Sequence, residues 1–212
     1  MDMTAVRTDR SLSRTSARTQ ARIVEAVVEA VAQHGISGTT LANVAALAEV
    51  SQGVLIFHFK SKEGLFAETL RRLIDEYQQG WQAALAEPDP LKRIVKLVRS
   101  DFDAAICNRK TLALWFAFWG EAAAQPLYNA ICAESEIQRY EAMIAACRAF
   151  CETNKGETCD PALLAHSIDA MTDGLWLQMH ISAKSLSRTD ARAMAMAHLR
   201  LLLPKWADVI PQ

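Results

Sequence analysis

Apolar positions along most of this chain recur at the spacing of α-helices rather than strands. In the first clear segment they fall at i, i+3, i+4, i+7 and i+8, which places them on one helical face. These residues are Ile23, Ala26, Val27, Ala30 and Val31. Gly35 follows as a stop signal, so the pattern predicts a helix over about 18–34.

Small polar residues mark where the next helices begin. Thr39 or Thr40 caps a second helix, Ser51 a third and Ser61 a fourth, because their hydroxyls can accept the free N–H groups of a first turn. The fourth helix is predicted over 62–86.

Prolines and acidic caps divide the second half of the chain. Asp89-Pro90 and Asp160-Pro161 each read as a cap followed by a first helical residue, and Gln125-Pro126 marks another break. Ser187 and Asp190 have capping-box spacing before a last helix over 188–203. We therefore predict an all-α fold of about nine helices without a sheet.

Residues 39–62 hold the most specific pattern in the chain. Two short helices are joined by a tight turn, and basic residues follow the second, which is the layout of a helix-turn-helix that reads the DNA major groove. The predicted organisation has three parts. They are a flexible Arg-containing arm at 1–17, a three-helix helix-turn-helix DNA-binding domain at 18–64, and a helical ligand-binding and dimerisation domain at 65–208.

Composition narrows the class of protein. A chain of 212 residues with 51% apolar residues is long enough for a small reading domain and a larger core. No run of 18 residues is free of charge or strong polarity, and the arginines spread over 1–22 leave no apolar centre for a secretory signal. We therefore expect a cytoplasmic protein without a membrane partner.

Charge supports selective rather than general binding to nucleic acid. The net charge is only −1, although residues 1–22 hold five arginines against two aspartates. Such an arm is either a solvated tail or a segment that lies along DNA phosphates.

Catalytic and metal chemistry find little support. The five cysteines lack paired C-x-x-C spacing; Cys147 and Cys151 lie one helical turn apart and could bind a metal or sense oxidation, but free thiols are the favoured interpretation. No nucleophile–base pair or phosphate loop is visible, and the five histidines share no local constellation, although His166 and His180 could meet in space. We expect no enzyme, no catalytic residue, no metal and no cofactor.

Two sets of motifs resemble a known family. The pattern Val50-Ser51-x-Gly53-x-Leu55-x-x-His58-Phe59-x-Ser61-Lys62-Glu63-x-Leu65 resembles the DNA-binding head of TetR-family repressors over about 18–66. Trp115-Phe116-Ala117-Phe118-Trp119, Gln125-Pro126-Leu127-Tyr128 and Asp173-Gly174-Leu175-Trp176-Leu177 resemble its BetI-like, choline-responsive branch. The resemblance implies a dimeric repressor that binds a near-palindromic DNA operator and is released by a small-molecule effector.

The resemblance also implies which residues contact DNA. Gln52 would pair with adenine and Val54 with a thymine methyl group, while Gly53 would allow close approach. Phosphate contacts would come from Thr40, Asn43, His58 and Lys62, although His58 could instead cap helix-end carbonyls. The candidate DNA-binding residues are Thr40, Asn43, Ser51, Gln52, Gly53, Val54, Phe57, His58 and Lys62.

Two positions depart from the family pattern. Ile56 stands where many members carry tyrosine, and Phe57 has no hydroxyl to replace that phosphate contact. Glu49 stands where glycine is common in the turn, at a cost of about 1 kcal/mol if the backbone there is left-handed.

Aromatic residues suggest a cation-binding effector site. A quaternary ammonium donates no hydrogen bond, so proteins surround it with aromatic faces and often a carboxylate. The candidate ligand-binding residues are Trp115, Phe116, Trp119, Asp173 and Trp176. Two other interpretations remain: these aromatics form core, and Asp173 caps a helix or pairs with His180 or a lysine.

Two effector classes stay open. One is choline or a related quaternary ammonium; the other is an unrelated hydrophobic compound, as in regulators of efflux or catabolic genes, and a pocket without convergent acids would favour it. The helix over 161–182 is apolar around most of its circumference, so it is either central in the core or part of a homodimer interface. Helix-turn-helix proteins usually act as twofold dimers, which favours the interface.

Overall fold

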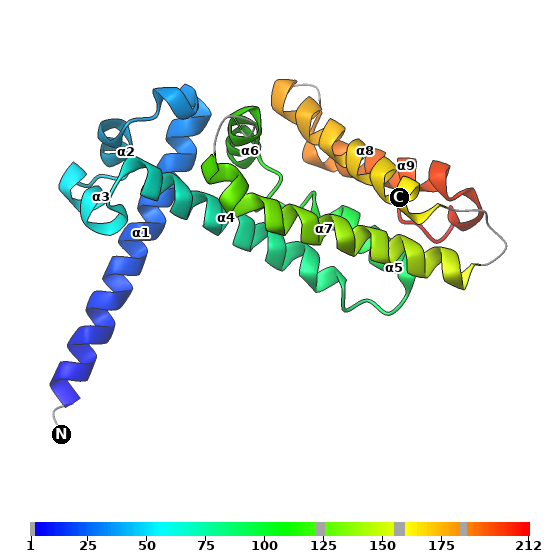
Figure 1. Ribbon diagram of the computed structural model, residues 1–212, viewed down its shortest axis with the longest axis horizontal. Helices are drawn as coiled ribbons and strands as arrows, with labels where there is room; N and C mark the ends of the chain where they lie inside the picture. Colours follow the sequence, from blue (N-terminus) through cyan, green and yellow to red (C-terminus); the bar gives the residue numbers. More distant parts are fainter. Residues whose placement is uncertain (1–2, 122–125, 155–159, 183–185) are drawn as a thin grey trace. The chain divides into compact units, whose positions relative to one another are not determined.

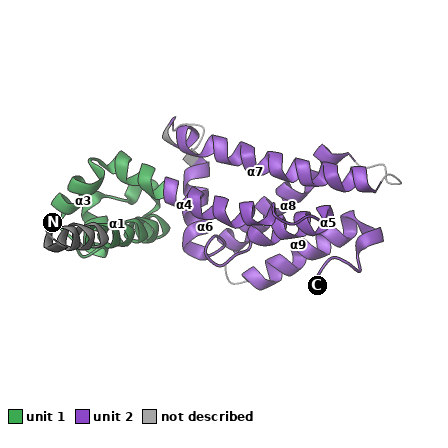
Figure 2. Ribbon diagram, turned by 90° about the horizontal axis from the view of Figure 1, so that it is seen from below, with its two compact units in different colours: residues 1–70 green, residues 71–212 purple. Residues whose placement is uncertain are grey.

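The computed structural model describes residues 3–121, 126–154, 160–182 and 186–212, and every regular element among them is helical. This confirms the all-α prediction (Figure 1). The chain forms two compact units, residues 1–70 and 71–212 (Figure 2). The first unit thus extends to Leu70, beyond the 18–64 expected for the reading domain.

Unit 1 contains α1 (Met3–Gly38), α2 (Leu41–Leu47), α3 (Gln52–Phe59) and the first turns of α4 (Lys62–Ala84). The five residues predicted to share one face of α1, Ile23 to Val31, are all buried, and α1 packs on α2. Helical geometry breaks at Gly35, whose φ of 68° and ψ of 176° suit a residue without a side chain.

The start of α1 differs from the prediction. The helix begins at Met3, so the segment to residue 17, expected as a flexible arm, is helical in the structure. The physical reason is that the first 34 residues contain no glycine or proline that would end a helix.

Unit 2 holds the remaining helices. They are α5 (Pro90–Ser100), α6 (Arg109–Glu121), α7 (Pro126–Thr153), α8 (Pro161–Ile181), α9 (Arg188–Leu202) and a short 3-10 turn, Pro204–Trp206. α7 packs against α5 and α8, and α8 also packs against α6 and α9. A central α8 therefore explains why that helix is apolar on several sides.

The predicted caps are present. Thr40, Ser51, Asp89, Asp160 and Ser187 each accept a backbone N–H from the first turn of the helix that follows. These side chains explain why the boundaries of five helices could be predicted closely.

One break was not predicted. α5 ends at Ser100 and α6 begins at Arg109, and the loop between them starts with the buried Asp101. The signal for this boundary was Asn108, whose Oδ1 accepts the backbone N–H groups of Lys110 and Thr111.

The cysteines are mostly as expected. Cys107, Cys132 and Cys147 are free and buried, and burial raises the pKa of each thiol to about 12. Cys151 is disulfide-bonded, so the free-thiol interpretation is wrong at that position. Within the described part of the chain, no cluster of three His, Cys, Asp or Glu side chains is placed to hold a metal ion.

A hydropathy test finds no helix among the described residues that is long and apolar enough by itself to cross a membrane. The bent pair α2 and α3 passes that test when taken together.

The turn between α2 and α3 contains a strained residue. Glu49 has a φ of 50°, in the left-handed region where a β-carbon is unfavourable. The left-handed turn at Glu49 lets the next backbone N–H, that of Val50, donate to the carbonyl of Ala45 at 3.0 Å, so the turn depends on this conformation.

We expect Glu49→Gly to stabilise the protein by about 0.5–1 kcal/mol, because glycine removes the left-handed strain at a small entropic cost. Denaturant unfolding followed by circular dichroism measures the difference. The matched control is Ala46→Gly at an exposed helical position, which should destabilise by a similar amount. Equal loss of stability in both variants would contradict the strain at Glu49.

Candidate functional site

The axes of α2 and α3 meet at 105° across a short turn. This is the angle that places the second helix of a helix-turn-helix in a position to enter the major groove. Leu55 and Phe59 are buried and hold α3 on its inner side.

The beginning of α2 is held by a capping box. The Thr40 hydroxyl accepts the backbone N–H of Asn43 at 3.2 Å, and Asn43 Oδ1 accepts that of Thr40 at 2.8 Å. Asn43 also donates from Nδ2 to the carbonyl of Gly38 at 3.1 Å. The Asn43 side chain, a candidate phosphate contact, is therefore already engaged in shaping its own helix.

The outer side of α3 is uncharged. Ser51, Gln52 and Gly53 are exposed at its start, and Val54 is half-buried. Further along, the Phe57 side chain is 71% exposed and Ile56 42%. A surface of this kind offers one amide, one hydroxyl and several apolar groups to base edges, which suits adenine and thymine methyl contacts.

Basic side chains lie at the far end of α3. Lys60 donates from Nζ to the carbonyl of Phe57 at 3.0 Å, and Lys62 Nζ lies 5.5 Å from the centre of the Phe66 ring. His58 is half-buried, with Nδ1 3.4 Å from Gln20 Nε2 on α1. The Gln20 contact gives His58 a bridging position between α1 and α3 that the sequence did not indicate.

Unit 2 contains a cavity of about 360 Å³ bounded by α4, α6, α7 and α8. This is the size range of small-molecule sites. Its lining consists of Ile74, Tyr77, Asp101, Trp115, Trp119, Cys132, Ser135, Glu136, Arg139, Tyr140, Asp169, Thr172, Asp173 and Trp176.

Five aromatic rings line the cavity, and four of them, those other than Tyr140, contact one another as one wall. Trp119 stacks on Trp176 with ring centres 6.3 Å apart, and it lies 6.1 Å from Trp115. The Tyr77 ring meets both Trp115 and Trp176 edge-on at 6.1 Å. Because α4, α6 and α8 each contribute a ring, the wall exists only when these helices are packed together.

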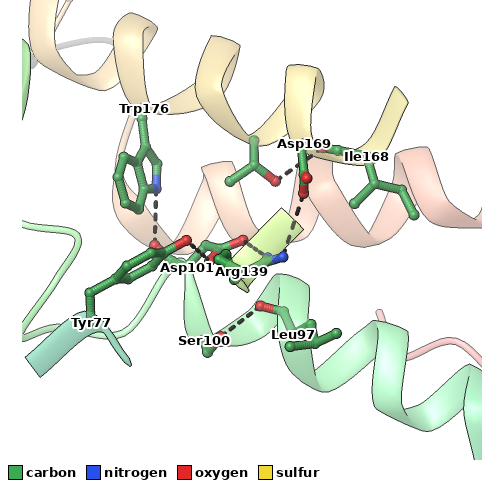
Figure 3. A network of polar contacts seen from close by, with 9 residues as sticks. Tyr77, Leu97, Ser100, Asp101, Arg139, Ile168, Asp169 and Trp176 are labelled. Carbon is green, nitrogen blue, oxygen red and sulfur yellow. Dashed lines mark hydrogen bonds and ion pairs between the residues drawn. The ribbon is translucent and has the colours of Figure 1, made fainter. Parts of the chain in front are cut away.

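A polar network lies beside this aromatic wall (Figure 3). The Tyr77 hydroxyl donates to Asp101 Oδ1 at 3.0 Å, and Trp176 Nε1 donates to the Asp101 carbonyl at 2.9 Å. Arg139 donates from Nη2 to Asp101 Oδ2 at 2.9 Å. A second carboxylate oxygen, Asp169 Oδ1, lies 3.7 Å from Arg139 Nη1.

The cavity carries more negative than positive charge. Four carboxyl groups, Asp101, Glu136, Asp169 and Asp173, face one guanidinium, that of Arg139. Burial raises the pKa of Asp169 to about 7, and it raises that of Asp173, at the exposed rim, to about 6. Arg139 stays charged, because the attraction of Asp101 and Asp169 outweighs its burial and raises its pKa. A cation entering the cavity would relieve the repulsion among these acids.

The predicted ligand residues largely come together. Trp115, Trp119, Asp173 and Trp176 all line the cavity. Phe116 lies outside the lining, where it stacks on His180 with ring centres 5.0 Å apart, so its predicted place in the site is not supported.

Several cavity residues were missed from the sequence. Tyr77 lies within a long amphipathic helix, Arg139 looks like any surface charge of α7, and Asp101 lies in the break that was not predicted. The sequence does place Asp169 one turn before Asp173 on the same side of α8, but Asp169 was not chosen as a ligand residue.

Comparisons with known proteins match both units. Residues 23–69 match the family model described as bacterial regulatory proteins of the tetR family, and residues 90–204 match that of the C-terminal part of BetI-type transcriptional repressors. A relative from Paraburkholderia phymatum, named HTH-type transcriptional regulator BetI, is 29% identical over 194 residues, covering 82% of this chain and 88% of the relative. A BetI regulator from Serratia proteamaculans is 27% identical over 172 residues, covering 80% and 84%.

Solved structures show the same fold at lower identity. A transcriptional regulator from Saccharomonospora viridis, solved in complex with choline, superposes with a TM-score of 0.73 at 21% identity, covering 87% of this chain and 96% of that one. A regulator from Pseudomonas aeruginosa gives a TM-score of 0.72 at 22% identity, covering 91% and 93%.

We expect Asp169→Asn to stabilise the protein relative to the wild type by a margin that grows from pH 5 to pH 8, reaching about 1 kcal/mol. A carboxyl group whose pKa is raised by folding contributes most stability below its unfolded pKa near 4. That contribution is lost as the pH rises to about 7. Denaturant unfolding of the variant and the wild type at pH 5 and pH 8 measures this difference in the free energy of unfolding.

Asp208→Asn, at an exposed position of the same unit, is the control. A stability difference between Asp169→Asn and the wild type that is the same at pH 5 and pH 8 would refute the raised pKa of Asp169.

Proposed function

Because the chain belongs to the TetR family of transcriptional regulators, in its BetI-type branch, we propose that it is a dimeric repressor whose operator binding is released by a small quaternary ammonium compound such as choline. The observation that carries the effector class is the cavity of unit 2. There, four aromatic rings lie beside an excess of carboxyl groups.

The chemistry of that cavity fits a cation that cannot donate hydrogen bonds. Methyl groups of a quaternary ammonium contact the faces of Trp119 and Trp176, and the ring quadrupoles attract the charge. Asp173 at the rim and Asp169 further in supply the opposite charge. The choline complex of the Saccharomonospora regulator, a protein of the same fold, supports this class.

An unrelated hydrophobic effector fits less well. Such a compound would leave the carboxyl groups of the cavity desolvated without a counter-charge, which is costly. A cavity without acidic side chains would have favoured a hydrophobic effector. Asp169 and Asp173 both line this cavity, so it lacks that feature.

The second copy is proposed to dock on α8 and α9. Exposed apolar side chains form one stripe on each helix, Leu163, Leu177 and Ile181 on α8 and Met194 and Leu201 on α9. The spacings, 14 and 4 residues on α8 and 7 residues on α9, keep each set on one helical face. Twofold pairing would bury these side chains, which a lone chain exposes to water.

Helix α4 offers a physical link between effector and DNA. Its first turns belong to unit 1, and Ile74 and Tyr77 on its later turns line the cavity. A bound cation that displaces Tyr77 would move the same helix that follows α3 in the chain. Release then follows if the shifted dimer no longer matches two major grooves about 34 Å apart.

Fluorescence anisotropy tests the function directly. The probe is a labelled duplex selected from a random pool by the purified protein, titrated at fixed salt with choline and with an uncharged hydrophobic control. We expect tight binding that choline reverses and the control does not. A selected duplex that choline never releases would overturn the effector class, and failure to select any duplex would overturn the repressor function.

We expect Gln52→Ala to weaken binding to the selected duplex by about 1–3 kcal/mol and to relax selectivity at one base pair, because its amide would contact adenine. Repeating the selection with the variant measures both effects. Gln33→Ala, at an exposed position of α1 in the same unit, is the matched control. Unchanged selectivity in the Gln52 variant would remove this residue from base reading.

A further inference from the structure

Resting on the effector function proposed above, we propose that Arg139 reads an oxygen acceptor on the effector. The ligand class is then a quaternary ammonium joined by a short linker to a neutral oxygen, a hydroxyl or an ester. Neither a bare tetraalkylammonium nor a betaine-type carboxylate fits the cavity as well.

The observation is a guanidinium that is only partly satisfied. Arg139 is 5% exposed and lines the cavity. Its Nη2 donates to Asp101, but neither Nε nor Nη1 has a hydrogen-bond acceptor within the described residues. The nearest acid to Nη1, Asp169, is 3.7 Å away, which is too long for a hydrogen bond.

A second donor lies in the same lining. The Ser135 hydroxyl is buried without a hydrogen-bond partner among the described side chains, four residues before Arg139 on α7. Residues four apart lie on one side of a helix, and both residues line the cavity, so α7 brings two unsatisfied polar side chains to its wall. Buried donors are costly to leave unpaired, and an oxygen on the ligand would satisfy them.

The aromatic wall and Arg139 are adjacent parts of one site. Asp101 joins them, since one carboxylate oxygen accepts from Tyr77 of the wall and the other from Arg139. Figure 3 shows Tyr77 and Arg139 meeting at this residue. A ligand that places its cation against the rings can therefore reach the guanidinium with a chain of a few atoms.

Charge decides which acceptor is favoured. Four carboxyl groups already share the cavity with Arg139. A ligand carboxylate would add a fifth negative group close to Asp101 and Asp169, whereas a hydroxyl or ester oxygen satisfies the same N–H groups without repulsion.

The first test uses the wild-type protein and three ligands. Tryptophan fluorescence at pH 8 measures the affinities of tetramethylammonium, choline and glycine betaine. We expect choline to bind at least about 10-fold more tightly than tetramethylammonium, the gain expected from a hydrogen bond to a charged donor. Glycine betaine should bind more weakly than choline.

The outcomes separate the two proposals. If none of the three ligands binds, the cation-sensing function fails. If tetramethylammonium binds as tightly as choline, the function stands and the acceptor reading by Arg139 is wrong. If glycine betaine binds more tightly than choline, the preference for a neutral oxygen is wrong.

A variant assigns the effect to Arg139. Arg139→Lys keeps the positive charge beside Asp101 but loses the Nε and Nη1 donors. We expect the preference for choline over tetramethylammonium, measured as the ratio of the two affinities, to fall several-fold. Arg148→Lys, on the exposed side of the same helix, should leave both affinities unchanged. An unaltered preference in Arg139→Lys would overturn the assignment, and if this variant does not fold, the wild-type ligand series decides.

Discussion

The ion pair and hydrogen bonds of the buried Asp101 carboxylate are the interactions on which unit 2 depends. Asp101 is 2% exposed, so its charge requires partners from the protein. Arg139 of α7 and the hydroxyl of Tyr77 on α4 bind its two oxygens, and Trp176 of α8 binds its backbone carbonyl. Three helices are thereby fixed around one residue, and the cavity is the space that remains between them.

This arrangement gives the cavity two properties, a balance of charge and an aromatic surface. Arg139 neutralises one carboxylate and prevents the cavity from being purely acidic, while the remaining acids, Glu136, Asp169 and Asp173, would attract the cation that we propose as effector. Aromatic rings from α4, α6 and α8 supply the surface that a quaternary ammonium needs. A protein with the rings alone would bind apolar compounds equally well.

The DNA-reading unit follows a different principle. Its reading helix contains no Asp, Glu, Lys or Arg, its one basic residue is the half-buried His58, and its outer face offers Gln52, Val54, Ile56 and Phe57. We therefore propose that most of the attraction to phosphates comes from outside α3, from lysines at its end such as Lys62. A helix with this surface depends on methyl and amide contacts for selectivity rather than on arginine contacts to guanine.

Local signals determined the elements, the helix-turn-helix and part of the site. Caps such as Ser51 and Asp89 act within one helical turn, so the sequence alone predicts where those helices begin. The tryptophans of α6 and α8 could be chosen as site residues because aromatic residues at helical spacing are visible in the sequence. Only the tertiary structure decided that Phe116 lies outside the lining of the cavity and that Tyr77, Asp101 and Arg139 meet inside it. These three residues come from separate segments of the chain, and the burial that makes their charges and hydroxyl matter exists only after the helices have packed.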